Sequence, residues 1–301
     1  MTGISAAAPA TVPRKRRSNP WGYLFVLPYV LHFLIFTAYP LGFALYLTTH
    51  RWDIVSSEKT FVGLRYFQKL LTDELFFKAL QNTLIFLAVH VPLQIVVALA
   101  LAVVLNGRVR FRTFFRTAFF LPFVTSGAVI AIIWTQLYAG DGLLNGVLRG
   151  LHLPPVEWLT STKIAMPAIA LMATWKNVGY YLMIFLAGLQ NIPDSLYEEA
   201  NLNGATAWQR FRYITLPLLN PAMLLVLVLS TIGAFSLFVE PFVMTGGGPV
   251  DSTLSVVLLL YRNAFQFLNM GYAATIGVVL ALIIFAVTYL QRRVVEQELT
   301  Y

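Results

Sequence analysis

The sequence has no cysteine and few charged residues, and these two scarcities exclude several classes of protein. Without cysteine there is no disulfide, no thiol nucleophile and no cysteine-based metal site. Only 11% of the 301 residues are charged and 58% are hydrophobic, whereas about a quarter are charged in an average soluble domain. The composition therefore indicates an integral membrane protein, long enough for one polytopic domain.

Motifs for nucleotide hydrolysis and metal chemistry are missing as well. A phosphate-binding P-loop needs Gly-Lys-[Ser/Thr], and none of the six lysines follows a glycine. There is no His-Glu-x-x-His motif, and the four histidines, at positions 32, 50, 90 and 152, lack the spacing of metal ligands. The sequence therefore predicts no catalytic residue, no metal site and no enzyme activity within this chain.

Six hydrophobic segments are each long enough to cross a bilayer, which takes about 20 residues. A seventh apolar run, Leu254–Tyr261, is too short to span and is expected to form an interfacial or re-entrant piece. The predicted fold class is an all-α integral membrane protein with six transmembrane helices. These helices are expected near Trp21–Leu47, Ala79–Leu105, Thr117–Leu137, Ile164–Leu189, Leu216–Val239 and Ala273–Leu290.

The charge distribution predicts which side of the membrane holds the chain ends. With six spans both termini share one side, together with the loops at 106–116 and 190–215. That side holds twelve Lys or Arg and five Asp or Glu, whereas the other side holds eight of each. The basic side is cytoplasmic by the positive-inside rule. The predicted organisation is a basic, disordered cytoplasmic tail at 1–20, a transmembrane domain at 21–290 and a cytoplasmic tail at 291–301.

The net charge of +8 does not indicate a nucleic-acid partner. Its densest part, Arg14-Lys15-Arg16-Arg17, directly precedes a predicted span. A short basic run in that place is typical of a topology signal and of an anchor at the anionic inner surface of the membrane. Membrane lipid is therefore the expected partner of these side chains.

The most polar long run in the second half of the chain is Leu196–Leu219, which reads LYEEANLNGATAWQRFRYITLPLL. Ser195-x-x-Glu198 has capping-box spacing, which predicts a helix that begins at Ser195. Tyr197, Ala200, Asn201 and Gly204 fall on one face of that helix, and Gly204 can end it in a left-handed conformation. An aromatic anchor beside small residues favours a docking element. The alternative is a linker helix that rests on its own spans.

The same loop carries a family pattern. Glu198-Glu199-Ala200-Asn201-Leu202-Asn203-Gly204 is followed, after nine residues, by Ile214-Thr215-Leu216-Pro217. With Leu121-Pro122-Phe123-Val124 and Met244-Thr-Gly-Gly-Gly-Pro249, this pattern resembles the EAA-loop permeases of bacterial carbohydrate-type ABC importers, the maltose and glycerol-phosphate kind. The resemblance covers roughly residues 20–290. Glu199 and Asn203 depart from it, because the family has Ala and Asp there.

The resemblance implies a type I importer permease that carries a sugar or sugar derivative across the bacterial cytoplasmic membrane. It implies a second homologous permease subunit, an extracytoplasmic solute-binding protein and two copies of a cytoplasmic ATPase. ATP and magnesium would bind to that ATPase, and this chain would bind no cofactor. The residues expected to couple to the ATPase are Tyr197, Glu198, Glu199, Ala200, Gly204 and Phe211.

A second candidate site lies in the middle of the fourth span. The segment Trp175–Tyr181 offers aromatic faces and an amide, which are the groups that bind sugars, and the resemblance adds four positions of the fifth span. A lysine at membrane depth usually faces a cavity or a partner. Lys176 could pair with Glu240 or snorkel, and each aromatic could merely pack between helices. The predicted substrate path comprises Trp175, Lys176, Asn177, Tyr180, Tyr181, Ser230, Gly233, Ala234 and Leu237.

An ion-gradient-driven secondary carrier is the alternative function. Carriers of that class place carboxylates or histidine relays within their spans. Here Glu240 lies at the edge of a span, and His90 with Gln94, one turn apart in the second span, is better suited to an interhelical hydrogen bond. An ABC permease subunit is therefore the function that the sequence favours.

Overall fold

The computed structural model describes residues 21–52, 58–107 and 109–295. The tail predicted at 1–20 and the end of the second tail, 296–301, lie outside the described residues. The chain divides into two units after Ala44, and each is described by itself.

The first unit is one helical run that continues into the second. Helix α1 (Trp21–Phe33) leads through a π-helical turn, η1 (Leu34–Ala38), into α2 (Tyr39–Leu47). The 24 residues from Leu24 to Leu47 are long and apolar enough to cross a membrane, in agreement with the first predicted span.

A small hairpin and a short helix open the second unit. Strands β1 (His50–Trp52) and β2 (Lys59–Phe61) are antiparallel, and His50 pairs with Phe61. Helix α3 (Arg65–Thr72) follows and ends at Asp73. The Asp73 carboxylate then accepts hydrogen bonds from the backbone amides of Leu75 (2.9 Å) and Phe76 (3.4 Å), so it caps the next helix.

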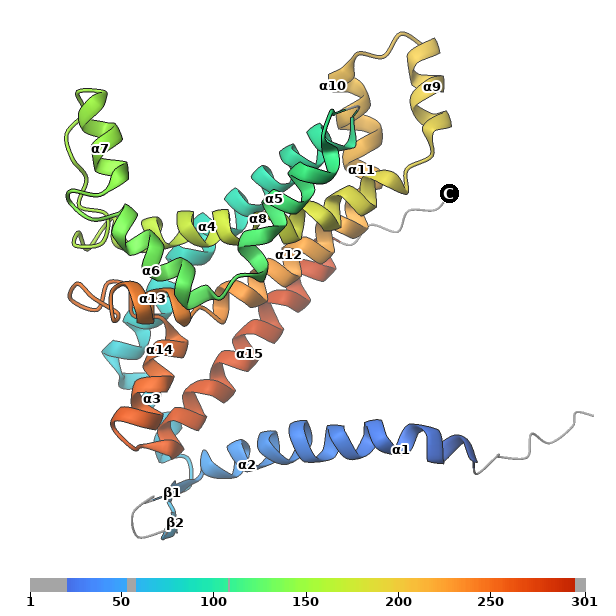
Figure 1. The fold of residues 1–301 in the computed structure, drawn as a ribbon. Coiled ribbons are helices and arrows are strands. Elements are labelled where there is room, and N and C mark those ends of the chain that lie inside the picture. Colours follow the sequence, from blue (N-terminus) through green and yellow to red (C-terminus); the bar gives the residue numbers. More distant parts are fainter. Residues whose placement is uncertain (1–20, 53–57, 108, 296–301) are drawn as a thin grey trace, which may run out of the picture. The chain divides into compact units, whose positions relative to one another are not determined.

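Four long helices form the framework of the second unit (Figure 1). Helices α4 and α8 make the most extensive helix–helix contact, which small residues such as Ala98 and Ala173 permit by letting the backbones approach. The bounds confirm four predicted spans within a few residues, although the fifth span continues past α12. The four helices are α4 (Glu74–Asn106), α8 (Ala165–Gln190), α12 (Asn220–Phe235) and α15 (Met270–Val295).

The third predicted span is not one continuous helix. It consists of α5 (Arg112–Val124) and α6 (Gly127–Leu137), which are bent by 98°. Thr125 between them is extended, and Ser126, with φ of −52° and ψ of 127°, is not helical either. With this pair counted as one span, the described residues hold six candidate spans, as predicted. Pro122, which cannot donate to a helix ladder, and Gly127 flank the break.

Packing shows that the bent pair joins opposite ends of the helix framework. Helices α4 and α8 run parallel, because Phe86 packs near Met166 at one end and Leu105 near Leu189 at the other. The carbonyl oxygen of the Gln190 side chain, which follows Leu189 at that second end, accepts hydrogen bonds from Arg112 and Arg116 at the start of α5.

At the first end, the hydroxyl of Tyr138, just after α6, donates to the backbone oxygen of Ala168 near the start of α8 (2.8 Å). The α5–α6 pair therefore runs the full length of the framework.

The remaining elements are short. Helix α14 lies buried against α4 and α15, and its six residues confirm that the seventh apolar run is too short to span. Helix α7 lies at one end of α8, and α9 and α10 lie at the other (Figure 1). These short elements are α7 (Leu143–Gly150), α9 (Asp194–Leu202), α10 (Ala207–Arg210), η2 (Phe211–Thr215), α11 (Leu216–Leu218), α13 (Val239–Met244), α14 (Val256–Tyr261) and η3 (Arg262–Gln266).

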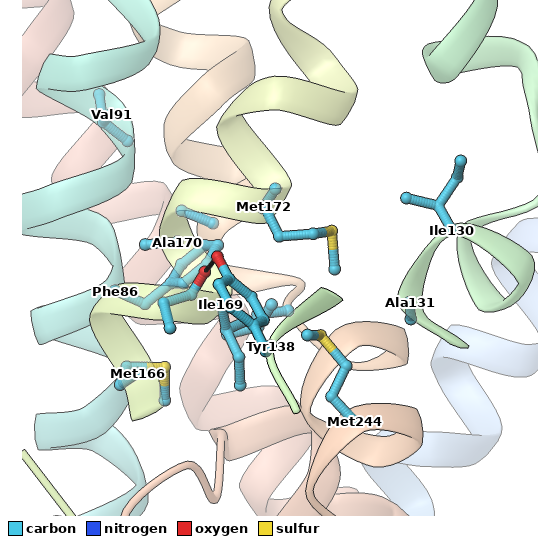
Figure 2. Packing of buried hydrophobic residues seen from close by; sticks show 14 residues of the cluster. Phe86, Val91, Ile130, Ala131, Tyr138, Met166, Ile169, Ala170, Met172 and Met244 are labelled. Atoms are coloured by element: carbon cyan, nitrogen blue, oxygen red, sulfur yellow. Dashed lines mark hydrogen bonds between the residues drawn. The ribbon is translucent and has the colours of Figure 1, made fainter. Parts of the chain in front are cut away.

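The core near the start of α8 joins side chains of four helices (Figure 2). Phe86 of α4, Ile130 of α6, Met172 of α8 and Met244 of α13 belong to this one buried cluster. Further along α8, Gly179 meets α5 so closely that a Cβ there would collide with the backbone of Phe119. Helix α5 is thus fixed against α8 by direct backbone contact, which positions the break beside the fourth span.

Candidate functional site

Two groups of residues that the sequence singled out lie at different levels of the second unit. The first, called here the coupling segment, comprises residues 190–215 and projects beyond the end of α8 (Figure 1). The second is a cavity of about 280 Å³ within the helix framework. Helix α8 connects the two, because it contributes lining residues to the cavity and its last residue begins the coupling segment.

The coupling segment begins differently from the prediction. Helix α9 starts at Asp194, its N-cap is Pro193, and no side chain caps it. Ser195 is already inside the helix, so the predicted capping box of Ser195 and Glu198 is wrong. Pro193 takes the extended conformation of an N-cap, so the helix begins one residue before Ser195.

The end of α9 confirms the role expected for glycine. Gly204 is left-handed, with φ of 76°. Its amide donates to the Asn201 carbonyl oxygen (3.0 Å), and the Ala205 amide donates to that of Ala200 (2.9 Å). These two bonds form a Schellman motif, which satisfies carbonyls at the helix end and reverses the chain.

Side-chain hydrogen bonds hold α9 against the elements that follow it. The Tyr197 hydroxyl lies 2.9 Å from the Thr215 hydroxyl, and Arg210 donates to the Asn201 side chain. A capping box that the sequence reading missed, Thr206 with Gln209, starts α10. Tyr197 and Asn201 therefore face their own chain, in contrast to the docking face expected for them. The spacing Thr206-x-x-Gln209 was the signal that could have identified this cap.

The outer surface of the coupling segment carries negative charge and exposed apolar groups. Glu198 and Glu199 are exposed and make no ion pair within the described part of the chain. Leu202 is 90% exposed, and Trp208, 69% exposed, lies 5.7 Å from the half-buried Phe211 ring. Such a surface suits contact with a second protein better than contact with water alone.

The cavity gathers part of the predicted substrate path. Asn177 and Tyr181 of α8 and Gly233 of α12 line it, and so does Leu237, just after α12. Six lining residues were not in the predicted path, among them Phe86, Phe123 and Ser236. They place aromatic rings and a hydroxyl beside the Asn177 amide.

Glu240 also lines the cavity, and it forms an ion pair with Lys176, which does not line it. Its Oε1 lies 3.3 Å from the Lys176 Nζ, and both side chains are mostly buried. Lys176 thus forms the ion pair that was one of the two alternatives left open, and its role in the substrate path stays a prediction. Glu240 lies in the first turn of α13, beyond the end of α12 at Phe235, so the helical period of the fifth span could not have added it to the predicted path.

The other predicted path residues lie elsewhere. Trp175 lines a separate apolar groove of about 380 Å³ between α4, α5 and α8. Tyr180 stacks on Phe123 with ring centroids 4.6 Å apart. Ser230 and Ala234 are fully buried. For these residues the structure favours packing over contact with the cavity.

The two polar residues weighed for an interhelical bond differ from each other. His90 lines the cavity, and its Nδ1 lies 2.9 Å from the Thr174 hydroxyl of α8, as expected. Gln94 is fully buried, and neither its oxygen nor its nitrogen has a hydrogen-bond partner among the described residues. Among those residues there is also no group of three or more His, Cys, Asp or Glu that could hold a metal ion.

The helix framework, its internal polar cavity and its projecting loop define a polytopic membrane transport protein. Residues 94–299 match the family model "Binding-protein-dependent transport system inner membrane component". The chain belongs to this family, which confirms the resemblance found in the sequence, and it is a multi-pass inner-membrane permease component.

Named relatives cover almost the whole chain. The lactose transport system permease protein LacF of Rhizobium radiobacter is 37% identical over 92% of this chain and 94% of its own length. The sn-glycerol-3-phosphate transport system permease protein UgpA of Agrobacterium fabrum is 35% identical over 93% and 96%.

A solved structure shares the fold. It belongs to a bacterial alginate ABC transporter in complex with a periplasmic protein that holds an alginate pentasaccharide. The TM-score is 0.78 over 93% of this chain and 96% of that chain, at 23% identity. At this identity the likeness shows the fold alone, and the all-α permease fold predicted from the sequence is confirmed.

Proposed function

We propose that this chain is the permease subunit of a bacterial ABC importer and forms part of the path of a sugar or sugar derivative. The names of its relatives, which transport lactose and sn-glycerol 3-phosphate, support a substrate of this kind. ATP hydrolysis takes place on two copies of a separate cytoplasmic ATPase. A second permease subunit and an extracytoplasmic solute-binding protein complete the assembly.

The observation that carries the proposal is the continuity of α8 between cavity and coupling segment. Asn177, which lines the cavity, and Gln190, which ends α8, lie on one helix. At about 1.5 Å per residue they are roughly 20 Å apart. A helix transmits displacement along its length, so movement of the coupling segment reaches the cavity wall directly.

The coupling segment is the site where the ATPase docks. Its fold is fixed internally by the Gly204 turn and by the bonds of Tyr197 and Arg210. It therefore moves as one body when the ATPase moves. Glu198 and Glu199 are exposed and pair with basic residues of the ATPase. We infer that both termini share the cytoplasmic side with this segment.

The test is to separate docking from folding by changing two residues. Glu198→Ala removes one partner of an interfacial charge pair. Exposed pairs contribute about 0–1 kcal/mol, whereas truncation of a desolvated interfacial pair costs about 2–5 kcal/mol. We expect the second range, so ATPase binding weakens at least about tenfold. Gly204→Val should reduce binding further, because a β-branched residue is strained at positive φ.

Matched variants make the result specific. Gly204→Asn keeps a residue that tolerates the left-handed conformation and should retain most binding. Gly146→Val, in α7 at the opposite end of α8, should leave it unchanged. The measurements are co-purification of the ATPase and sugar uptake by vesicles given either internal ATP or an ion gradient. Normal binding and uptake by Gly204→Val would refute coupling, failed membrane insertion would favour a linker, and uptake driven only by the ion gradient would favour a secondary carrier.

A further inference from the structure

The charge balance of the cavity bears on the kind of sugar that it can hold. Among the described residues that line it, Glu240 is the only Asp or Glu, and there is no Lys or Arg. Phosphate and carboxylate groups are bound in proteins mainly by Arg and Lys, whose donors carry the compensating charge. The lining therefore has no such cation to offer to an acidic sugar.

The Lys176 ammonium group, close to the cavity, is already paired with Glu240. Its Nζ lies 3.3 Å from Glu240, and the two side chains are only 15% and 12% exposed. Gly127, at the start of α6, lies close to the ammonium group on another side, because a Cβ at that position would be 2.8 Å from Nζ. The ammonium group is thus enclosed between the α5–α6 break and Glu240, and little room is left for it to turn toward an anion.

The remaining polar groups suit neutral hydroxyls. Asn177 has no hydrogen-bond partner within the described chain, so its amide can both donate and accept. The Ser236 hydroxyl donates to the Ile232 carbonyl oxygen (2.9 Å), which leaves its oxygen free to accept. Phe86, Phe123 and Tyr181 supply apolar faces for the C–H side of a sugar ring.

We propose that the substrate is an uncharged sugar, and that the Lys176–Glu240 pair keeps phosphorylated and carboxylated sugars out of this chain's part of the path. The inference rests on the proposed function and deepens it. The ion pair has no net charge and leaves no free cation, so an acidic sugar would find nothing to compensate its charge, whereas a neutral sugar needs no such compensation.

The first test compares neutral and acidic sugars on the complete transporter in proteoliposomes. The probes are lactose, maltose and arabinobiose against sn-glycerol 3-phosphate and digalacturonate. Each ATP-dependent uptake rate is divided by the fraction of solute-binding protein loaded with that sugar, so that the ratio reports the membrane step. We expect the neutral sugars to be favoured at least about tenfold in this ratio.

Three variants test the ion pair itself. Glu240→Gln leaves the Lys176 charge unpaired beside the cavity, so the ratio of acidic to neutral uptake should rise about tenfold or more. The double variant Lys176→Met with Glu240→Gln removes both charges and should restore the preference for neutral sugars. Gly127→Ala pushes the ammonium aside without changing any charge and should lower uptake of both classes alike.

The outcomes separate a failure of the neutral-sugar inference from a failure of the proposed importer function. A wild-type preference for acidic sugars, or an unchanged ratio in Glu240→Gln while the double variant assembles normally, would overturn the inference and leave the importer function standing. Absence of ATP-dependent uptake for every sugar would overturn both. If neither Glu240→Gln nor the double variant assembled, the wild-type ratio alone would decide.

Discussion

At the scale of single residues, a close contact between two helices of the framework is made by a residue without a side chain. Gly179 lets α8 and α5 approach until their backbones touch, and a Cβ would collide with Phe119 and approach Phe120. Phe119 lies a few residues before the break at Thr125 and Ser126. The contact therefore fixes the break between α5 and α6 relative to Lys176 and its ion pair, because Lys176 lies on α8 three residues before Gly179.

Gly179→Ala should destabilise the protein because the added methyl group has no space. Overpacking of a close-packed contact costs about 1–3 kcal/mol, so we expect a lower melting temperature in detergent and a smaller yield. Gly146→Ala is the matched control, since nothing lies within 4 Å of its Cβ position. Equal melting temperatures for the two variants would show that α5 can move away from α8 at little cost.

At the scale of elements, the coupling segment depends on the cap of α10 rather than on a cap of α9. Thr206→Ala removes the hydroxyl that accepts from the Gln209 amide (3.3 Å). Loss of an N-cap costs about 1 kcal/mol. Amide hydrogen exchange across 204–215 should become several-fold faster. Ser195→Ala should leave exchange unchanged, because its side chain makes no hydrogen bond to any of the residues that the structure describes. If the two variants behaved alike, the assignment of the cap would be wrong.

The lengths of the elements could be predicted, but their bends could not. Length and apolarity determine that a segment can span, and the predicted bounds of α4, α8 and α15 are close to those observed. Hydropathy does not register the 98° bend, because Thr125 and Ser126 interrupt an otherwise apolar stretch without a charge. Pro122 and Gly127 were the only local signs of it.

The site could be predicted only in part, for a related reason. Neighbouring residues of a helix point about 100° apart, so the continuous motif at 175–181 cannot face one cavity. Asn177 and Tyr181, four apart, line it, whereas Trp175 lies in another groove. The sequence suggested Glu240 only as a partner for Lys176. Its position on the cavity depends on the turn between α12 and α13, which the helical period does not predict.

At the scale of the whole molecule, both chain ends are predicted to lie in the cytoplasm. The side that holds them carries twelve Lys or Arg against five Asp or Glu, and such an excess is retained inside. Reporter fusions at residue 1 and residue 301 that are active only in the cytoplasm would agree with this. Periplasmic activity of either fusion would contradict it, and a fusion within 141–150, at the α7 end, should give the opposite signal.

The α5–α6 pair also determines whether the chain ends lie on the same face of the membrane. Neither half is long enough to cross alone, so the pair could have been a loop that dips in and returns. Because α4 and α8 are parallel, the chain must change sides between them, and the pair is a true crossing. With the first helical run counted as a span, the described residues hold six candidate crossings, which is an even number. Only the gain or loss of a whole crossing, and no change in loop length, would send the two chain ends to opposite faces.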